Sequence, residues 1–148
     1  MAAESLVNGD GYADLAAGMP KAAVGGKAKA GYVNVVWGSP KGLGGKGSTS
    51  VSQDTTGVPG TAEADDLFGT AVAAADLNGD GYSDLTVTAP GERLTDTGIE
   101  RQGTATVCGA RPPASGAGSP RPRARQTAGS AGCLRWATTT TTATRTSP

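Results

Sequence analysis

The sequence predicts an all-β protein built from repeated units, and three observations support this prediction. An acidic, glycine-containing phrase occurs twice, beginning at Asn8 and at Asn78, which gives a period of 70 residues. Each copy leads into a short apolar run that ends at a proline, Pro20 or Pro90. Repetition on this scale is typical of propellers and solenoids, in which each unit buries its apolar face against the next.

The individual strands are expected on both sides of each phrase. Residues 68–75 are small and apolar, and residues 85–89 are rich in residues that favour strands. A later strand is expected at residues 31–38, and residues 103–107 repeat its pattern. We therefore expect residues 12–53 and 68–107 to form the antiparallel strands of adjacent units, with an outer strand within residues 49–56.

The second copy of the phrase has the composition of a calcium-binding loop. Oxygen-bearing side chains occupy loop positions 1, 3, 5 and 9, and a main-chain carbonyl can serve at position 7. Hard cations such as calcium take six to eight oxygen ligands, and alternate side chains of a tightly curled loop can face one centre. Gly79 and Gly81 allow that curl. The predicted metal ligands are Asp76, Asn78, Asp80, Tyr82 and Asp84.

The first copy is predicted to bind calcium weakly. Its equivalent ligands are Asn8, Asp10, Tyr12 and Asp14. Position 1 is Leu6, which has no oxygen in its side chain. Removing one oxygen from the set lowers the affinity expected for a hard cation.

Three other interpretations of the second phrase compete with a calcium loop between strands. An EF-hand requires a carboxylate at position 12, where this chain has Val87, and requires flanking helices, which the sequence does not predict. An Asx-rich β-turn with solvated charges is the simpler alternative. The carboxylates could also serve a metal-assisted hydrolase.

These residues resemble the FG-GAP repeats of integrin α-subunit propellers and of secreted bacterial proteins. Phe68-Gly69 matches the FG of the family, residues 76–84 match its calcium loop, and Thr88-Ala89-Pro90 stands where the family has Gly-Ala-Pro. The resemblance implies a partial β-propeller of one to two blades. It also implies Ca²⁺ as the cofactor, an adhesive or ligand-binding role toward a protein or carbohydrate, and an extracellular location. The missing blades of a parent propeller are further implied partners.

The charge distribution divides the chain after Val107. All 13 acidic residues precede Cys108, so the net charge is −6 over residues 1–107 and +6 over residues 108–148, which contain six arginines. The second segment has one leucine and no Ile or Phe. Such a composition buries too little apolar surface to offset the entropy of folding. We therefore expect an irregular, exposed C-terminal tail that does not pair with the preceding strands.

A single-base frameshift after Val107 would explain this tail. Codons chosen for residues 108–116 can be read, one base shifted, as LWGSASGLG, which resembles residues 36–44. Residues 136–148 can be read in the same frame as LGDYDNDGYADLA, another calcium phrase. A natural basic tail and a folded tail are the alternatives. The predicted domains are a partial first blade at 1–62, an incomplete second blade at 63–107 and an out-of-frame, disordered tail at 108–148.

The functional prediction is a non-catalytic propeller fragment. The chain has no histidine, which excludes His-based triads and imidazole acid–base catalysis. No nucleic-acid partner and no membrane span are predicted. Residues 1–5 lack the features of a signal peptide, which would leave the chain, if expressed, in the cytoplasm despite the family's extracellular setting. Two alternatives stay open: blades of a larger secreted hydrolase, and a non-functional gene remnant.

Overall fold

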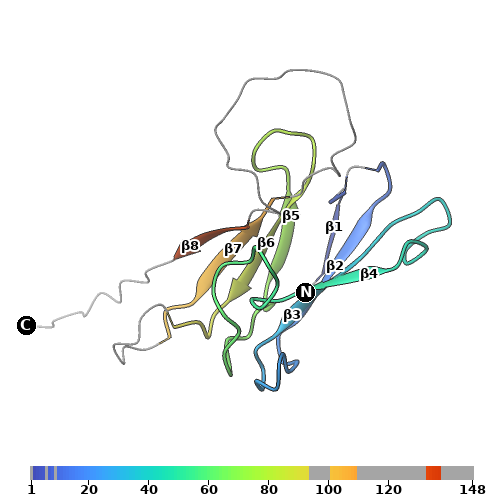
Figure 1. Ribbon diagram of the computed structural model, residues 1–148. Coiled ribbons are helices and arrows are strands. Elements are labelled where there is room, and N and C mark those ends of the chain that lie inside the picture. The colour runs from blue at the N-terminus through green and yellow to red at the C-terminus, as the bar shows by residue number, and fades with distance from the viewer. Residues whose placement is uncertain (1, 6, 9, 94–100, 110–132, 138–148) are drawn as a thin grey trace, which may run out of the picture.

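The computed structural model describes residues 2–5, 7–8, 10–93, 101–109 and 133–137, which form two four-stranded antiparallel sheets (Figure 1). The strands of each sheet follow chain order from one edge to the other. The first sheet contains β1 (Ala2–Ser5), β2 (Asp14–Met19), β3 (Tyr32–Val36) and β4 (Ser48–Val51). The second contains β5 (Val72–Ala75), β6 (Asp84–Ala89), β7 (Thr104–Cys108) and β8 (Cys133–Ala137).

Alternation of buried and less buried side chains sets the register of the central strands. Val33 and Val35 are buried in β3, which pairs with β2 from Leu15↔Val36 to Met19↔Tyr32. A shift of one residue would turn these valines away from the core, so the apolar pattern specifies the pairing. In β6 the buried apolar side chains are Leu85, Val87 and Ala89.

The two sheets share one hydrophobic core. β1 lies beside β5, and the remaining strands of each sheet fan away from this contact (Figure 1). Side chains from both sheets form the core: Ala16, Val33, Val35, Phe68, Val72, Leu85, Val87 and Ala89. Phe68, in the connection that enters the second sheet, is fully buried. The arrangement is that of two adjacent blades of a partial β-propeller.

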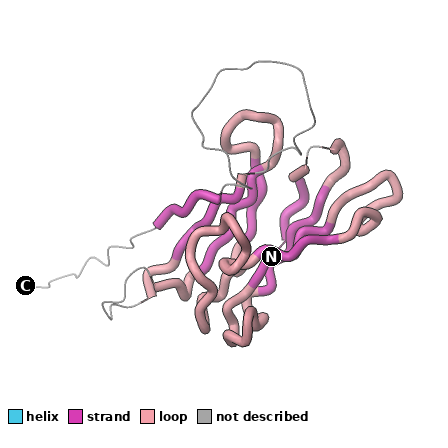
Figure 2. Tube along the Cα trace, in the orientation of Figure 1, coloured by secondary structure: helices cyan, strands magenta, loops and turns pink. Residues whose placement is uncertain are grey.

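The predicted fold class is confirmed. The described part of the chain contains strands and loops and no helix (Figure 2). β5 and β6 flank residues 76–84, as the calcium-loop interpretation requires and the EF-hand interpretation forbids. No helix long and apolar enough to span a membrane occurs among the described residues.

Two features of the sheets differ from the sequence predictions. β1 was not anticipated, because Ala2–Ser5 is too short to show a strand pattern. The expectation that the tail does not pair with the blade is wrong for Cys133–Ala137, which forms β8 along β7. The physical reason is that an unpaired strand edge offers a row of backbone donors and acceptors to any extended segment. The predicted disorder of residues 110–132 and 138–148 lies outside the described residues.

The pairing of β8 also concerns the cysteines. Cys108, the last residue of β7, is disulfide-bonded. In the strand register it lies opposite Cys133, the other cysteine of the chain. The disulfide of Cys108 is a covalent feature that the charge pattern did not predict.

Candidate functional site

The second loop, residues 76–84, curls around the carboxylate of its first residue. Asp76 Oδ1 accepts hydrogen bonds from the backbone N–H groups of Gly79 at 2.6 Å and Asp80 at 3.2 Å. Its Oδ2 accepts one from Gly81 at 2.9 Å. Gly79 and Gly81 have φ angles of +76° and +88°, which favour glycine. Asp76 therefore organises the loop through three backbone donors.

Two further side chains of the second loop repeat this local bonding. Asn78 Oδ1 accepts from the N–H of Asp80, and Asp80 Oδ1 accepts from the N–H of Tyr82, both at 2.9 Å. Each bond spans two residues, the pattern of an Asx turn. The backbone donors, that of Gly81 foremost, hold the pKa of Asp76 below its ordinary value because they stabilise its ionised form.

Asp84 connects the second loop to β6. It is the first residue of that strand and is buried. Its Oδ2 accepts a hydrogen bond from the N–H of Leu77 at 3.2 Å, and its Oδ1 lies 3.5 Å from Nδ2 of Asn78. The loop thus closes on the strand that follows it.

The donor chemistry of the second loop fits calcium, because carboxylate, amide and carbonyl oxygens are the ligands that this ion prefers. The side chains themselves are engaged with the backbone of the loop. Among the residues that the structure describes, no three Asp, Glu, His or Cys side chains lie close enough to hold a metal ion. Metal binding by Asp76, Asn78, Asp80, Tyr82 and Asp84 stays a prediction. It requires the carboxylates of the three aspartates to turn from the backbone toward the ion.

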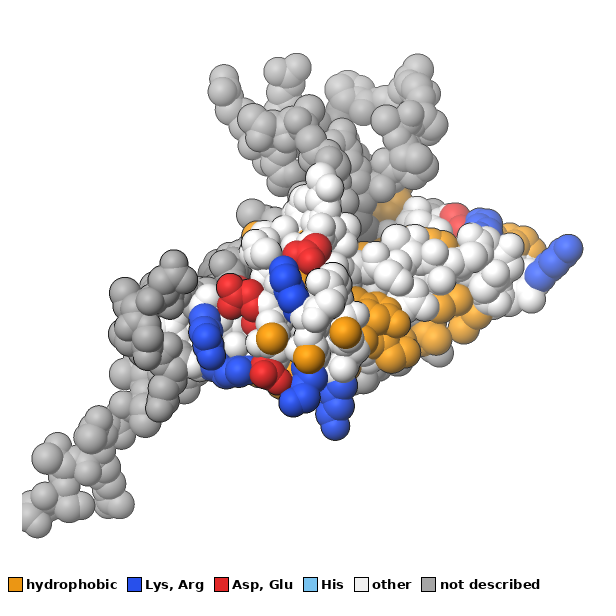
Figure 3. Space-filling model, turned by 60° about the horizontal axis from the view of Figure 1, so that its bottom comes forward, with side chains coloured by type: hydrophobic (Ala, Val, Ile, Leu, Met, Phe, Trp, Pro, Cys, Tyr) orange, Lys and Arg blue, Asp and Glu red, His pale blue; other side chains and the backbone are white. Residues whose placement is uncertain are grey.

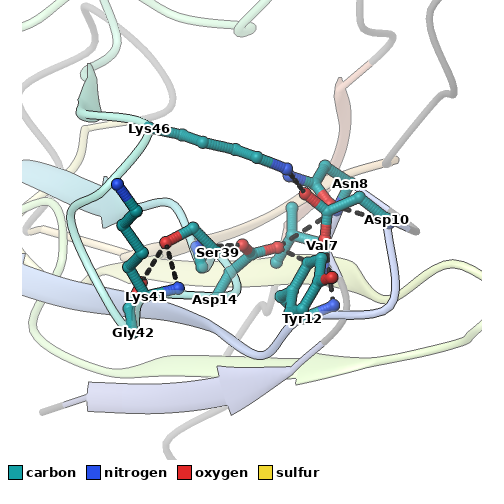
Figure 4. Close-up of polar contacts among 10 residues, drawn as sticks. Val7, Asn8, Asp10, Tyr12, Asp14, Ser39, Lys41, Gly42 and Lys46 are labelled. Carbon is teal, nitrogen blue, oxygen red and sulfur yellow. Dashed lines mark hydrogen bonds and ion pairs between the residues drawn. The ribbon is translucent and has the colours of Figure 1, made fainter.

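The first loop has the same local bonds and is tied to the body of its sheet (Figure 4). Asn8 Oδ1 accepts from the N–H of Asp10, and Asp10 Oδ1 accepts from the N–H of Tyr12, both at 3.0 Å. Asp14 is fully buried. Its Oδ1 accepts from Gly38 at 2.8 Å, and its Oδ2 accepts from Val7 at 3.0 Å and from the next residue at 3.2 Å.

A lysine from the β3–β4 connection reaches the first loop. Nζ of Lys46 lies 2.5 Å from Oδ2 of Asp10 and 5.4 Å from the centre of the Tyr12 ring. The hydrogen bond from Lys46 holds the pKa of Asp10 below its ordinary value. Leu6, at the position equivalent to Asp76, lies outside the described residues.

The opposite end of the sheets contains a junction that the sequence analysis missed. The backbone N–H groups of Asp65, Leu67 and Phe68 donate to the carbonyls of residues 28, 29 and 30 at 2.9–3.0 Å. This ladder joins the segment before β5 to the β2–β3 connection. It places Phe68 in the core and positions the second blade against the first.

Close backbone packing at the junction depends on glycine. A Cβ atom at Gly18 would lie 1.9 Å from the carbonyl oxygen of Gly69, and one at Gly31 would lie 2.1 Å from that of Phe68. Both distances are far below contact distance, so a side chain at either position would separate the blades. The pair Phe68-Gly69 thus packs directly against glycines of the preceding blade.

Buried polar side chains complete the junction. Asp66 is 1% exposed and its Oδ2 accepts a hydrogen bond from the N–H of Glu63 at 2.5 Å. Burial raises the pKa of Asp66 to about 6, and the charge of buried Glu92 adds to this effect. Gln53 donates from Nε2 to Oε2 of Glu92. The only sequence signal for this cluster was its place beside the FG pair.

The surface over this end carries interspersed charges of both signs (Figure 3). Lys29 lies 3.1 Å from Asp65, Arg101 lies 3.6 Å from the same carboxylate, and Lys27 lies 3.9 Å from Asp54. All of these side chains are more than a third exposed, so solvent screens the pairs. The charges serve solvation more than packing.

Two four-stranded blades, each with an acidic loop between its first and second strands, define a propeller-type repeat protein. The family model of the FG-GAP repeat matches residues 68–108. The match runs from the buried Phe68 to the end of β7.

A curated relative is the phosphatidylinositol-glycan-specific phospholipase D of Bos taurus. It is 36% identical over 95 residues, which is 62% of this chain. The match spans 11% of the length of the bovine protein. The similarity therefore concerns a small part of that enzyme.

Proposed function

We propose that the chain is a calcium-binding, non-catalytic segment of a β-propeller, and that its second loop is the principal calcium site. The observation that carries the proposal is the curled backbone of residues 76–84, in which the N–H groups of Gly79, Asp80 and Gly81 bond to the carboxylate of Asp76. Calcium, when bound, would offset two of the three negative charges of this loop and cross-link it. The residues that would hold it are Asp76, Asn78, Asp80, Tyr82 and Asp84.

The structural consequence of binding would be a rigid turn between β5 and β6. The carboxylates repel one another in the absence of a cation, and an ion that binds only the folded loop stabilises the folded state. At a calcium concentration of about 100 times the Kd, this stabilisation amounts to about 2.7 kcal/mol. The loop end of the blades would then keep a fixed shape for recognition.

Calorimetric titration of the chain with calcium tests the proposal. The wild type is expected to show one dominant site, and Asp76→Ala is expected to abolish it, because this change removes a ligand and the acceptor of three backbone bonds. Leu77→Ala is the matched control, since Leu77 is 59% exposed and supplies no side-chain oxygen. Equal heats for Asp76→Ala and the wild type would contradict the proposal.

The biological role that best fits such blades is adhesion or ligand binding outside the cell. Millimolar extracellular calcium matches loops of modest affinity. The ligand class is a protein or a carbohydrate. Calcium-dependent retention on an array of immobilised glycans tests the carbohydrate form, and binding that survives a chelator would contradict the role of the loop.

A second candidate is that these blades accompany the catalytic part of a larger secreted hydrolase. The similarity to the bovine phospholipase D favours it, because 62% of this chain aligns with a protein of that name. The chain itself is then expected to leave a phosphatidylinositol glycan intact. Release of the glycan headgroup by the purified chain would overturn the non-catalytic assignment of both candidates.

A further inference from the structure

The two loops form the same hydrogen bonds between side chains and backbone, and the first loop also contacts a lysine. In each, an asparagine accepts from the residue two positions later, and an aspartate accepts from the tyrosine N–H that follows. The second loop has carboxylates at Asp76, Asp80 and Asp84. The first has Asp10 and Asp14, and the ammonium group of Lys46 contacts Asp10.

The fold fixes the backbone position of Lys46, whose side chain is 45% exposed while that of its partner Asp10 is 23% exposed. Its connection is closed by backbone hydrogen bonds between Trp37 and Gly47 at 3.0 Å and between Gly44 and Trp37 at 2.9 Å. The same connection supplies the N–H of Gly38 that binds buried Asp14. Two bonds thus join the β3–β4 connection to the first loop, one to each of its carboxylates.

The contacts of the ammonium group are those of a bound cation. It lies 2.5 Å from a carboxylate oxygen and 5.4 Å from the centre of the Tyr12 ring, whose face attracts positive charge. A divalent ion near Asp10 would stand close to this ammonium and would be repelled by it.

We propose that Lys46 is the built-in cation of the first loop and that it decides which loop takes calcium. The inference rests on the proposed function of the second loop. Lys46 satisfies Asp10 without a metal, so the first loop keeps its shape when calcium is absent. The second loop, with one carboxylate more, is left as the site for the divalent ion.

Terbium titration reports on both loops, because each contains a tyrosine that can sensitise the emission of the ion, Tyr12 or Tyr82. The Asp76→Ala background separates them, because it silences the second loop and leaves the signal of the first. Adding Lys46→Met there is expected to strengthen terbium binding about tenfold, since one repelling charge is removed near the site. Adding Asp10→Asn as a third change should abolish this gain.

Two further variants serve as controls. Lys41→Met removes a lysine of the same connection and should leave terbium affinity unchanged. Lys46→Arg keeps the positive charge and should also leave the first loop closed to terbium. Circular dichroism melts establish that each variant is folded. If Lys46→Met destabilises the chain, the melting temperature should be recovered by calcium more strongly than in the wild type.

The outcomes distinguish the two proposals. The role of Lys46 is overturned if Asp76→Ala/Lys46→Met binds terbium no more tightly than Asp76→Ala does. Equal calcium binding by the wild type and Asp76→Ala overturns the second loop as the principal site, whatever Lys46→Met does. A gain from Lys46→Met that Lys41→Met reproduces would reduce the effect to general surface charge and also overturn the inference.

Discussion

The two ends of the paired blades are held by different forces. At the loop end, short polar side chains such as Asp76 and Asp10 bond to nearby backbone N–H groups. At the junction end, Phe68 is fully buried, and a Cβ at Gly18 would collide with the next blade. Packing at the junction sets the fold, which leaves the loop end free to carry exposed carboxylates. Stability and ligand chemistry are therefore separated in this chain.

The largest expected effect is the loss of Phe68. Phe68→Ala should lower the free energy of unfolding by about 3–5 kcal/mol, because it leaves a cavity in the core shared by both blades. Leu77→Ala, at the loop end, should change it by less than about 0.5 kcal/mol, because that side chain is 59% exposed. Urea unfolding of both variants measures the contrast. Similar losses would mean that the two ends are not energetically distinct.

Substitution of Gly18 is expected to have the next largest effect. Gly18→Ala should cost about 1–3 kcal/mol, since its Cβ would meet backbone atoms of Gly69 that cannot move alone. Gly45→Ala is the matched control, because its Cβ would meet the side-chain oxygen of Ser39, which can rotate. Thermal melts compare them. An equally small loss for both would show that the blades can separate slightly at no cost.

The sequence predicted the loop end better than the junction. The phrase around Asp76 is local, so a curled loop there could be predicted from spacing alone, and β5 and β6 followed from the apolar runs around it. Metal binding by this loop stays a prediction. The junction is formed by residues distant in sequence: Gly31 faces Phe68, and Gln53 bonds to Glu92. A local pattern has no information about such pairs. The contact of Lys46 with Asp10 was missed for the same reason.

β8 illustrates a different limit of prediction. Composition correctly identified a segment poor in core-forming residues, yet pairing along an edge needs backbone groups more than a hydrophobic core. Cys133–Ala137 could therefore add to β7 despite the charge break after Val107. The frameshift itself is a statement about the gene, and sequencing the DNA around codon 108 checks it.

The third prediction uses pH to test the buried acid of the junction. The pKa of Asp66 is raised from 3.8 to about 6, chiefly by burial. The backbone N–H of Glu63 and the charge of Arg101 oppose the rise, and the charges of Glu92 and Glu63 add to it. Between these values the folded state retains a proton that the unfolded state has lost. The contribution of Asp66 to stability therefore falls as the pH rises from about 4 to about 6 and is constant above that range.

Asp66→Asn should remove this pH dependence, because the amide cannot ionise. The free energy of unfolding of the variant, relative to the wild type, should increase as the pH rises through this window. Urea titrations at about pH 4, 5, 6 and 7 measure the difference. A difference that stays constant across the series would show that Asp66 is not the titrating group.

The smallest expected effect concerns the exposed ion pairs over the junction. Lys29 lies 3.1 Å from Asp65, but its side chain is 58% exposed, and Arg101 lies 3.6 Å from the same carboxylate. Lys29→Met should therefore change the free energy of unfolding by less than about 1 kcal/mol, and added salt should reduce the difference further. Chemical unfolding at low and high salt measures both. A loss comparable to that of Phe68→Ala would mean that surface charge, rather than apolar packing, holds the blades together, and the contrast between the two ends would need to be redrawn.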